Sequence, residues 1–323
     1  MSPLPNLSRR AVLAGAAALS ACAPQAKTAK DDLTLRVASY KGGIQTLLPA
    51  AGLADTPYKV AYSEFAGGNL IAEAISARAL DLGSMSEIPP IFVAGKAPLL
   101  KLVAVQRGDV NSQVTLVPKD SALKSPADLK GKRVGFVKAT TAHYFLLRML
   151  AEQGLTFADI QPIALSPQDG LAAFGRGALD AWVIYGVQGS IARSRLGARV
   201  LTTGLGRLSG NYVQAALSEA LDDAPRHAAI ADYLRRSRQA YVWAEKNPEA
   251  WAAIQSQATG VAPEIYLQQH RERSAPTRLA PVDEAAIESQ QDVADTFAKT
   301  GVIPAKVDVR PLWTDVLNRE LAS

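Results

Sequence analysis

The chain has 323 residues, of which 48% are hydrophobic and 20% charged, and its formal net charge is +5. At ~100–200 residues per domain, this length predicts about two domains, and the composition excludes a disordered or fibrous protein. A single cysteine excludes a disulfide scaffold, and with only three histidines neither a metal site nor a cofactor is expected. The positive charges are spread along the chain, which does not favour nucleic-acid binding but is compatible with a small anionic ligand.

The N-terminus has the pattern of an export signal. Residues 9–10 are both arginine and precede the apolar run 11–19, which is far shorter than the ~20 residues that span a bilayer. The run leads into Leu-Ser-Ala-Cys at residues 19–22, which resembles a bacterial lipobox. This resemblance implies cleavage before Cys22 and attachment of a lipid to its sulfur.

We therefore predict a signal peptide over residues 1–21 and a flexible tether over 22–32. The mature protein is expected in the periplasm or at the cell surface, held to a membrane by its lipid. An ordinary secretory signal with a chance cysteine is the alternative. The segment 8–13 also resembles a twin-arginine motif, so the export route stays open.

Strands and helices alternate in the first part of the body. We predict strands over 33–38, 58–62 and 80–83, and a helix that begins at Asn69 as its N-cap. Strands separated by single helices predict a parallel sheet with right-handed crossovers.

The same pattern recurs further along the chain. A strand is predicted over 132–137 and a helix carries apolar residues from 144 to 150. Ser125 and Ser166 are each followed by proline and, three residues on, by aspartate, which predicts two further helix starts.

A short internal repeat connects these two parts. Ala-Leu-Asp occurs at 79–81 and again at 178–180, in both cases between a predicted helix and a short apolar strand. The matching position favours duplication and therefore two similar open α/β lobes. After about residue 218 helices dominate, including one over 282–300, and we expect them to pack back on the first lobe.

The loops that follow the predicted strands contain glycines, hydroxyl groups and helix starts, with few acids. In open α/β sheets such loops line the ligand crevice, and backbone N–H groups with hydroxyls form a neutral cradle for an anion. A permanently ionised oxyanion such as a sulfonate suits this cradle. No Gly-x-Ser-x-Gly, Walker or His-Glu-x-x-His motif occurs in the sequence, so no catalytic residue is predicted and the protein is not expected to be an enzyme.

Several strings carry a family resemblance, among them Val-Pro-Lys-Asp-Ser at 117–121, Asp-Leu-Lys-Gly-Lys at 128–132 and His-Tyr-Phe-Leu-Leu at 143–147. From about residue 33 to 217 the chain resembles the aliphatic-sulfonate-binding proteins of ABC importers, within the nitrate/sulfonate/taurine group of substrate-binding proteins. The resemblance implies a type II periplasmic-binding α/β fold. Its two open lobes are joined by two crossover hinges, close on a ligand and present it to a membrane permease.

This resemblance implies a domain organisation. Lobe 1 is expected over 33–115 and 218–323, and lobe 2 over 116–217, with crossovers near Thr115–Val117 and Tyr212–Leu217. We expect a monomer with a small sulfonate-like ligand and a permease as its partners.

The predicted binding residues lie in the loops after the strands. We expect two groups, one holding the anionic head and one flanking the organic tail. The head group comprises Lys41, Gly42, Gly43, Ser86, Thr140, Thr141 and His143; the tail group comprises Phe65, Met85 and Tyr185; and Tyr40, Glu87 and Gly186 complete the predicted site.

Other ligands and functions stay open. Where the family has an aromatic residue followed by Asp-Pro, this chain has Tyr185-Gly186-Val187, so the organic tail is not fixed by the resemblance. Nitrate, taurine and a thiamine-precursor pyrimidine are alternatives, the last because four aromatic residues could stack on it: Phe65, Tyr40, Tyr144 and Tyr185. The sequence does not distinguish import from a role as a solute-sensing partner of a membrane receptor. Desulfinases also resemble these proteins but use a cysteine nucleophile, and the only thiol here is Cys22.

Overall fold

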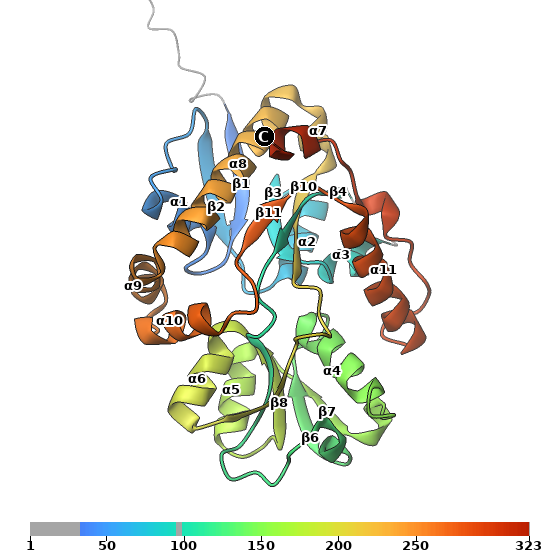
Figure 1. Ribbon diagram of the computed structural model, residues 1–323. Helices are drawn as coiled ribbons and strands as arrows, with labels where there is room; N and C mark the ends of the chain where they lie inside the picture. Colours follow the sequence, from blue (N-terminus) through green and yellow to red (C-terminus); the bar gives the residue numbers. More distant parts are fainter. Residues whose placement is uncertain (1–32, 95–98, 323) are drawn as a thin grey trace, which may run out of the picture.

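The computed structural model describes residues 33–94 and 99–322, which form a larger and a smaller lobe (Figure 1). The predicted signal peptide and tether lie outside the described residues. Within the described ranges, every helix is too short or too polar to span a lipid bilayer. The described His, Cys, Asp and Glu side chains form no group of three or more that could hold a metal ion.

The larger lobe is built on a six-stranded sheet with the order β11-β4-β10-β3-β1-β2. Strand β1 pairs in parallel with β2 and β3, as predicted, whereas β10 runs antiparallel between β3 and β4. The strands of this sheet are β1 (Thr34–Ser39), β2 (Lys59–Glu64), β3 (Leu82–Ser86), β4 (Leu100–Arg107), β10 (Asn211–Leu217) and β11 (Arg278–Ala280).

The smaller lobe repeats the plan with a five-stranded sheet of order β7-β6-β8-β5-β9. Strand β6 pairs in parallel with β7 and β8, and β5 runs antiparallel to β8 and β9. The strands are β5 (Gln113–Val117), β6 (Arg133–Phe136), β7 (Gln161–Ala164), β8 (Ala181–Tyr185) and β9 (Arg199–Thr203).

Helices cover both sheets (Figure 1). The smaller lobe carries α4 (Thr141–Ala151), α5 (Pro167–Gly175) and α6 (Gly186–Leu196), with short 3-10 turns at Pro126–Leu129 and Phe157–Asp159. The larger lobe carries α1 (Ile44–Ala50), α2 (Gly68–Ser76), α3 (Pro89–Ala94), α7 (Ser218–Asp222), α8 (Ala224–Lys246), α9 (Pro248–Thr259), α10 (Pro263–Glu272), α11 (Glu284–Lys299), a 3-10 turn at Arg310–Leu312 and α12 (Asn318–Ala322). The predicted return of the C-terminal helices to the first lobe is therefore confirmed.

The chain passes between the sheets twice, through residues 108–112 after β4 and residues 204–210 after β9. We predicted these crossovers near Thr115–Val117 and Tyr212–Leu217. In the structure, these two segments belong to strands β5 and β10 instead. Both segments are almost entirely buried, so their apolar pattern shows a strand but not the sheet to which that strand belongs.

The two connections lie against each other. The Gly108 N–H donates to the Gly210 carbonyl at 3.2 Å. Gly210 has a φ of +75°, and a Cβ there would stand 2.7 Å from the Gly108 carbonyl oxygen. Only glycine fits both this left-handed conformation and this close approach.

The Ala-Leu-Asp repeat has the same structural role in both lobes. Asp81 accepts hydrogen bonds from the Arg36 backbone N–H, Nε and Nη2 at 2.8, 3.1 and 2.6 Å. Asp180 accepts the same three bonds from Arg133 at 2.8, 3.1 and 2.7 Å. In each lobe the carboxylate joins the turn after a helix to the strand beside it, which supports the predicted duplication.

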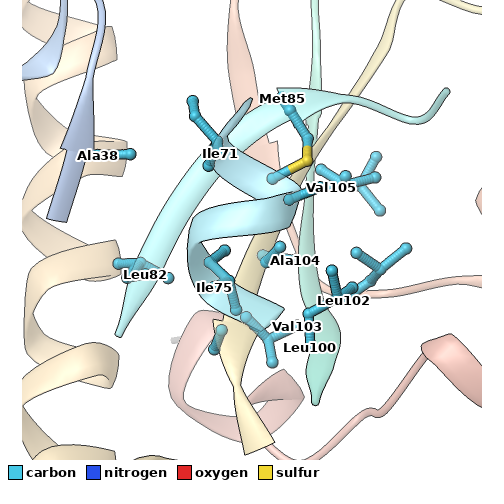
Figure 2. Packing of buried hydrophobic residues seen from close by; sticks show 14 of the residues in the cluster. Ala38, Ile71, Ile75, Leu82, Met85, Leu100, Leu102, Val103, Ala104 and Val105 are labelled. Carbon is cyan, nitrogen blue, oxygen red and sulfur yellow. The ribbon is translucent and has the colours of Figure 1, made fainter. Parts of the chain in front are cut away.

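The core of the larger lobe lies between its sheet and helices (Figure 2). Met85 is fully buried there, in a cluster with Ile71 and Val105. The predicted strand ends at residue 83 and leaves Met85 in the following loop, but β3 continues to Ser86, and the alternation of a strand turns Met85 into the core. A second difference concerns α2, whose N-cap is Gly67 rather than Asn69.

Candidate functional site

A cavity of about 410 Å³ lies at the junction of the two lobes. The ends of β1 and β3, the first connection and the start of α6 form one side, and α8, α9 and α10 form the other. Figure 1 shows α9 and α10 beside the gap between the lobes. The larger lobe supplies most of the wall, and the smaller lobe contributes Gly186 at the N-terminus of α6.

Four of the predicted residues line this cavity. Tyr40, Gly42 and Gly43 form the turn between β1 and α1, and Gly186 faces them from the other lobe. The turn is closed by the Gly43 N–H, which donates to the Tyr40 carbonyl at 2.8 Å. Gly42 has a φ of +69°, and a Cβ there would meet the Thr259 side chain at 2.8 Å. Glycine is therefore required at position 42, and glycine backbone lines the cavity at this turn.

Tyrosine hydroxyls gather beside this turn. The Tyr40 hydroxyl donates to the Ser84 carbonyl at 3.1 Å. Burial and the nearby Tyr212 and Tyr185 phenols raise the pKa of Tyr40 far above its usual value. Burial and Tyr212 raise the pKa of Tyr185 to about 12. Phenols in this state keep their protons at neutral pH, and the Tyr40 proton is already donated to Ser84.

Three charged side chains lie at the cavity, and each is already neutralised or hydrogen-bonded. Arg273 donates from Nη2 to Glu245 at 2.7 Å, and Glu245 also accepts from the Thr277 N–H at 2.9 Å. Burial opposes ionisation of Asp109, but hydrogen bonds from Ser112, Ser274 and other groups outweigh it and hold the Asp109 pKa below its usual value. The carboxylates are therefore committed to the protein's own donors.

The helical side of the cavity is aromatic. Tyr233 and Tyr241 come from α8, Trp251 from α9 and Tyr266 from α10. The two tyrosines of α8 have a signal in the sequence. A residue on one face of this helix recurs every four positions, at Tyr233, Ser237, Tyr241 and Glu245. This spacing does not by itself identify a binding wall, because a face that lines a cavity and a face that packs have the same period.

The other predicted residues do not line the cavity. Lys41 is exposed, Phe65 packs against the core of the larger lobe, and the Thr140 hydroxyl donates to the Val137 carbonyl at 2.7 Å. Met85 is buried in the core, as described above. Ser86 and Tyr185 are half-buried next to the cavity rather than in its wall.

Glu87 and Thr141 line a separate, smaller pocket rather than the cavity. The Glu87 carboxylate accepts from Ser209 at 2.6 Å and from Ser289 at 3.1 Å. Thr141 donates to Gln113 Oε1 at 2.8 Å. Glu87 thus joins the second connection to α11, and contact of Glu87 and Thr141 with a ligand stays a prediction.

His143 is buried among phenylalanine rings. Its ring centroid lies 4.9 Å from that of Phe136 and 5.4 Å from those of Phe157 and Phe297. Burial, followed by the nearby Lys138 charge, lowers the His143 pKa to about 4. The ring is therefore neutral at pH 7, and its Nδ1 accepts from the Ala139 N–H at 3.3 Å.

Comparison with known proteins gives the family. A family model described as NMT1/THI5 like matches residues 59–250, more than half of the chain, and the protein belongs to this family. A relative from Escherichia coli (strain K12), described as a candidate aliphatic sulfonates-binding protein, is 33% identical over 307 residues, covering 93% of this chain and 94% of the relative.

Two crystal structures match with similar strength. The periplasmic aliphatic sulphonate binding protein SsuA from Escherichia coli has a TM-score of 0.76 and 32% identity, and the match covers 86% of this chain and 90% of that one. The alkanesulfonate-binding protein SsuA from Xanthomonas axonopodis pv. citri, bound to MOPS, has a TM-score of 0.78 and 30% identity, with coverages of 87% and 98%. The predicted family resemblance and two-lobed fold class are confirmed.

The fold also occurs in an enzyme. The desulfurization enzyme DszB has a TM-score of 0.63 at 16% identity, covering 90% of this chain and 99% of that one. At this identity the likeness concerns the fold alone, and function must be argued from the site.

Proposed function

We propose that the protein is the extracytoplasmic binding component of an ABC importer, which captures an organic sulfonate in the cavity between its lobes and delivers it to a membrane permease. The observation that carries this proposal is the cavity itself: glycine backbone at the Gly42–Gly43 turn, neutral tyrosine side chains beside it, and carboxylates that already accept hydrogen bonds from the protein. Neutral donors suit an anion that never takes up a proton. The full-length similarity to sulfonate-binding proteins supports the same ligand class.

The alternatives fit the cavity less well. Nitrate would require a small, wholly polar pocket, whereas this cavity is large and partly aromatic. A pyrimidine could stack on the aromatic side and is the second candidate. We propose a non-catalytic role, because a desulfinase-like reaction requires a cysteine and Cys22 stands ahead of the folded lobes. We further propose that Cys22 carries a lipid that holds the protein to a membrane in the periplasm.

A ligand screen tests the proposal. Purified protein is heated with alkanesulfonates, taurine, nitrate or pyrimidines, and the unfolding temperature is measured. A sulfonate at ~100 times its dissociation constant should add about 2.7 kcal/mol to the free energy of unfolding. A shift with a pyrimidine and none with any sulfonate would contradict the proposal and support the second candidate.

Contacts between the lobes should contribute to affinity. Tyr144 on α4 donates to Asp292 on α11 at 2.7 Å, joining the smaller lobe to the larger one. Replacing Tyr144 by phenylalanine should weaken sulfonate binding about fivefold, because one hydrogen bond of ~1 kcal/mol no longer stabilises the joined lobes. Isothermal titration calorimetry with the sulfonate that gives the largest thermal shift measures this loss.

A matched control lies within one lobe. Tyr58 donates to Asp232 at 2.9 Å, and both residues belong to the larger lobe. Tyr58→Phe should lower stability but leave the dissociation constant unchanged. Equal affinity losses in the two variants would show that the Tyr144 bond has no special role in binding.

A further inference from the structure

The size of the cavity constrains the ligand that it is proposed to bind. A dry protein cavity of about 150 Å³ already admits benzene. The cavity here measures about 410 Å³. It therefore has room for a ring in addition to a sulfonate group, and a two-carbon sulfonate would leave much of it unfilled.

The two sides of the cavity differ in chemistry. The glycine backbone at the Tyr40–Gly43 turn suits the anionic head. Across from it, Tyr241 and Trp251 are half-buried and face the cavity from α8 and α9. Both rings pack against the core of the larger lobe, but among the described residues neither the Tyr241 hydroxyl nor the Trp251 indole N–H has a hydrogen-bond partner.

The remaining aromatic side chains of this wall are fixed. Tyr233 donates to the Tyr62 hydroxyl at 3.3 Å, and the Tyr266 hydroxyl lies 2.7 Å from Thr259 Oγ1. These bonds hold Tyr233 and Tyr266, whereas no hydrogen bond among the described residues holds Tyr241 or Trp251.

The charges at the cavity indicate whether the tail is neutral or cationic. Glu245 is paired with Arg273, and Asp109 is held by backbone and hydroxyl donors. Neither carboxylate needs a cationic group on the ligand. A neutral tail therefore fits better than an ammonium group.

We propose that the cavity selects sulfonates whose tail is an aromatic ring, and that Tyr241 and Trp251 are the residues that determine this selectivity. This inference rests on the proposed sulfonate function and narrows it to one substrate class. Rings that meet in offset or edge-to-face geometry gain stability beyond that of area burial alone.

Titration calorimetry with three sulfonates tests the inference. Benzenesulfonate should bind about tenfold more tightly than ethanesulfonate, and about threefold more tightly than cyclohexanesulfonate, which has a similar size but no aromatic face. Equal or tighter binding of ethanesulfonate, cyclohexanesulfonate or taurine would overturn the inference while leaving the proposed function intact. Binding of none of these sulfonates would overturn both.

Single substitutions test whether Trp251 and Tyr241 cause the preference for an aromatic sulfonate. Trp251→Leu and, separately, Tyr241→Leu should weaken benzenesulfonate binding about tenfold and change ethanesulfonate binding less than about twofold. Trp243→Leu is the matched control, because Trp243 packs against the core of the larger lobe as Tyr241 and Trp251 do, but it does not line the cavity. Equal losses for both ligands in the Trp251 and Tyr241 variants, or the same loss in the Trp243 variant, would overturn the assignment.

Discussion

Replacing Asp81 by alanine is expected to lower the free energy of unfolding by about 2–4 kcal/mol. The Asp81 side chain is fully buried, and it accepts hydrogen bonds from the backbone and the guanidinium of Arg36. Its removal leaves a buried N–H without an acceptor and a guanidinium without its partner. Urea unfolding followed by circular dichroism measures the loss.

The duplicated lobe provides the control. Asp180 makes the same bonds to Arg133, but its side chain is 32% exposed, so water can replace part of what is lost. Asp180→Ala should therefore cost about half as much as Asp81→Ala. Equal costs would mean that burial does not distinguish the two copies of the motif.

The second expected result concerns acid stability. The His143 pKa is about 4 in the folded protein and about 6.5 in the unfolded chain, so the unfolded state binds more protons between these values. Stability should therefore fall as the pH is lowered from about 6.5 to 4, by up to about 3 kcal/mol from this residue.

His143→Phe isolates this contribution, because phenylalanine keeps an aromatic ring among its neighbours but takes up no proton. The raised pKa of buried Glu87 acts in the opposite direction, so the effect is measured as the difference between the protein and the variant at each pH. If the two stability curves stay parallel from pH 7 to 4.5, the histidine is not held neutral by its surroundings.

The sequence predicted those helix starts and strands that depend on residues close to one another in the chain. The Ser166 hydroxyl accepts from the Asp169 N–H at 3.1 Å at the start of α5, and Ser125 and Asp128 form the expected capping box. Strands β1, β2 and β6 lie within two residues of their predicted bounds. Such signals depend on neighbours in sequence and need no tertiary information.

The parts that the sequence did not reveal depend on distant partners. β10 enters the larger sheet between β3 and β4, more than one hundred residues earlier in the chain, and nothing in its apolar run specifies that pairing. Of the predicted site residues, Tyr40, Gly42, Gly43 and Gly186 line the cavity, and their contact with a ligand stays a prediction. Loop position identified these four, whereas the wall from α8–α10 required the tertiary fold.

The unequal division of the cavity wall has a consequence for kinetics. Because the larger lobe supplies nearly all of the lining, an incoming molecule can make most of its contacts before the smaller lobe arrives. Discrimination between molecules would then occur in the encounter with one lobe, while residence time would depend on bridges such as Arg193–Glu272 and Tyr144–Asp292. A transport partner that separated these bridges would release the cargo without having to change the surface that recognised it.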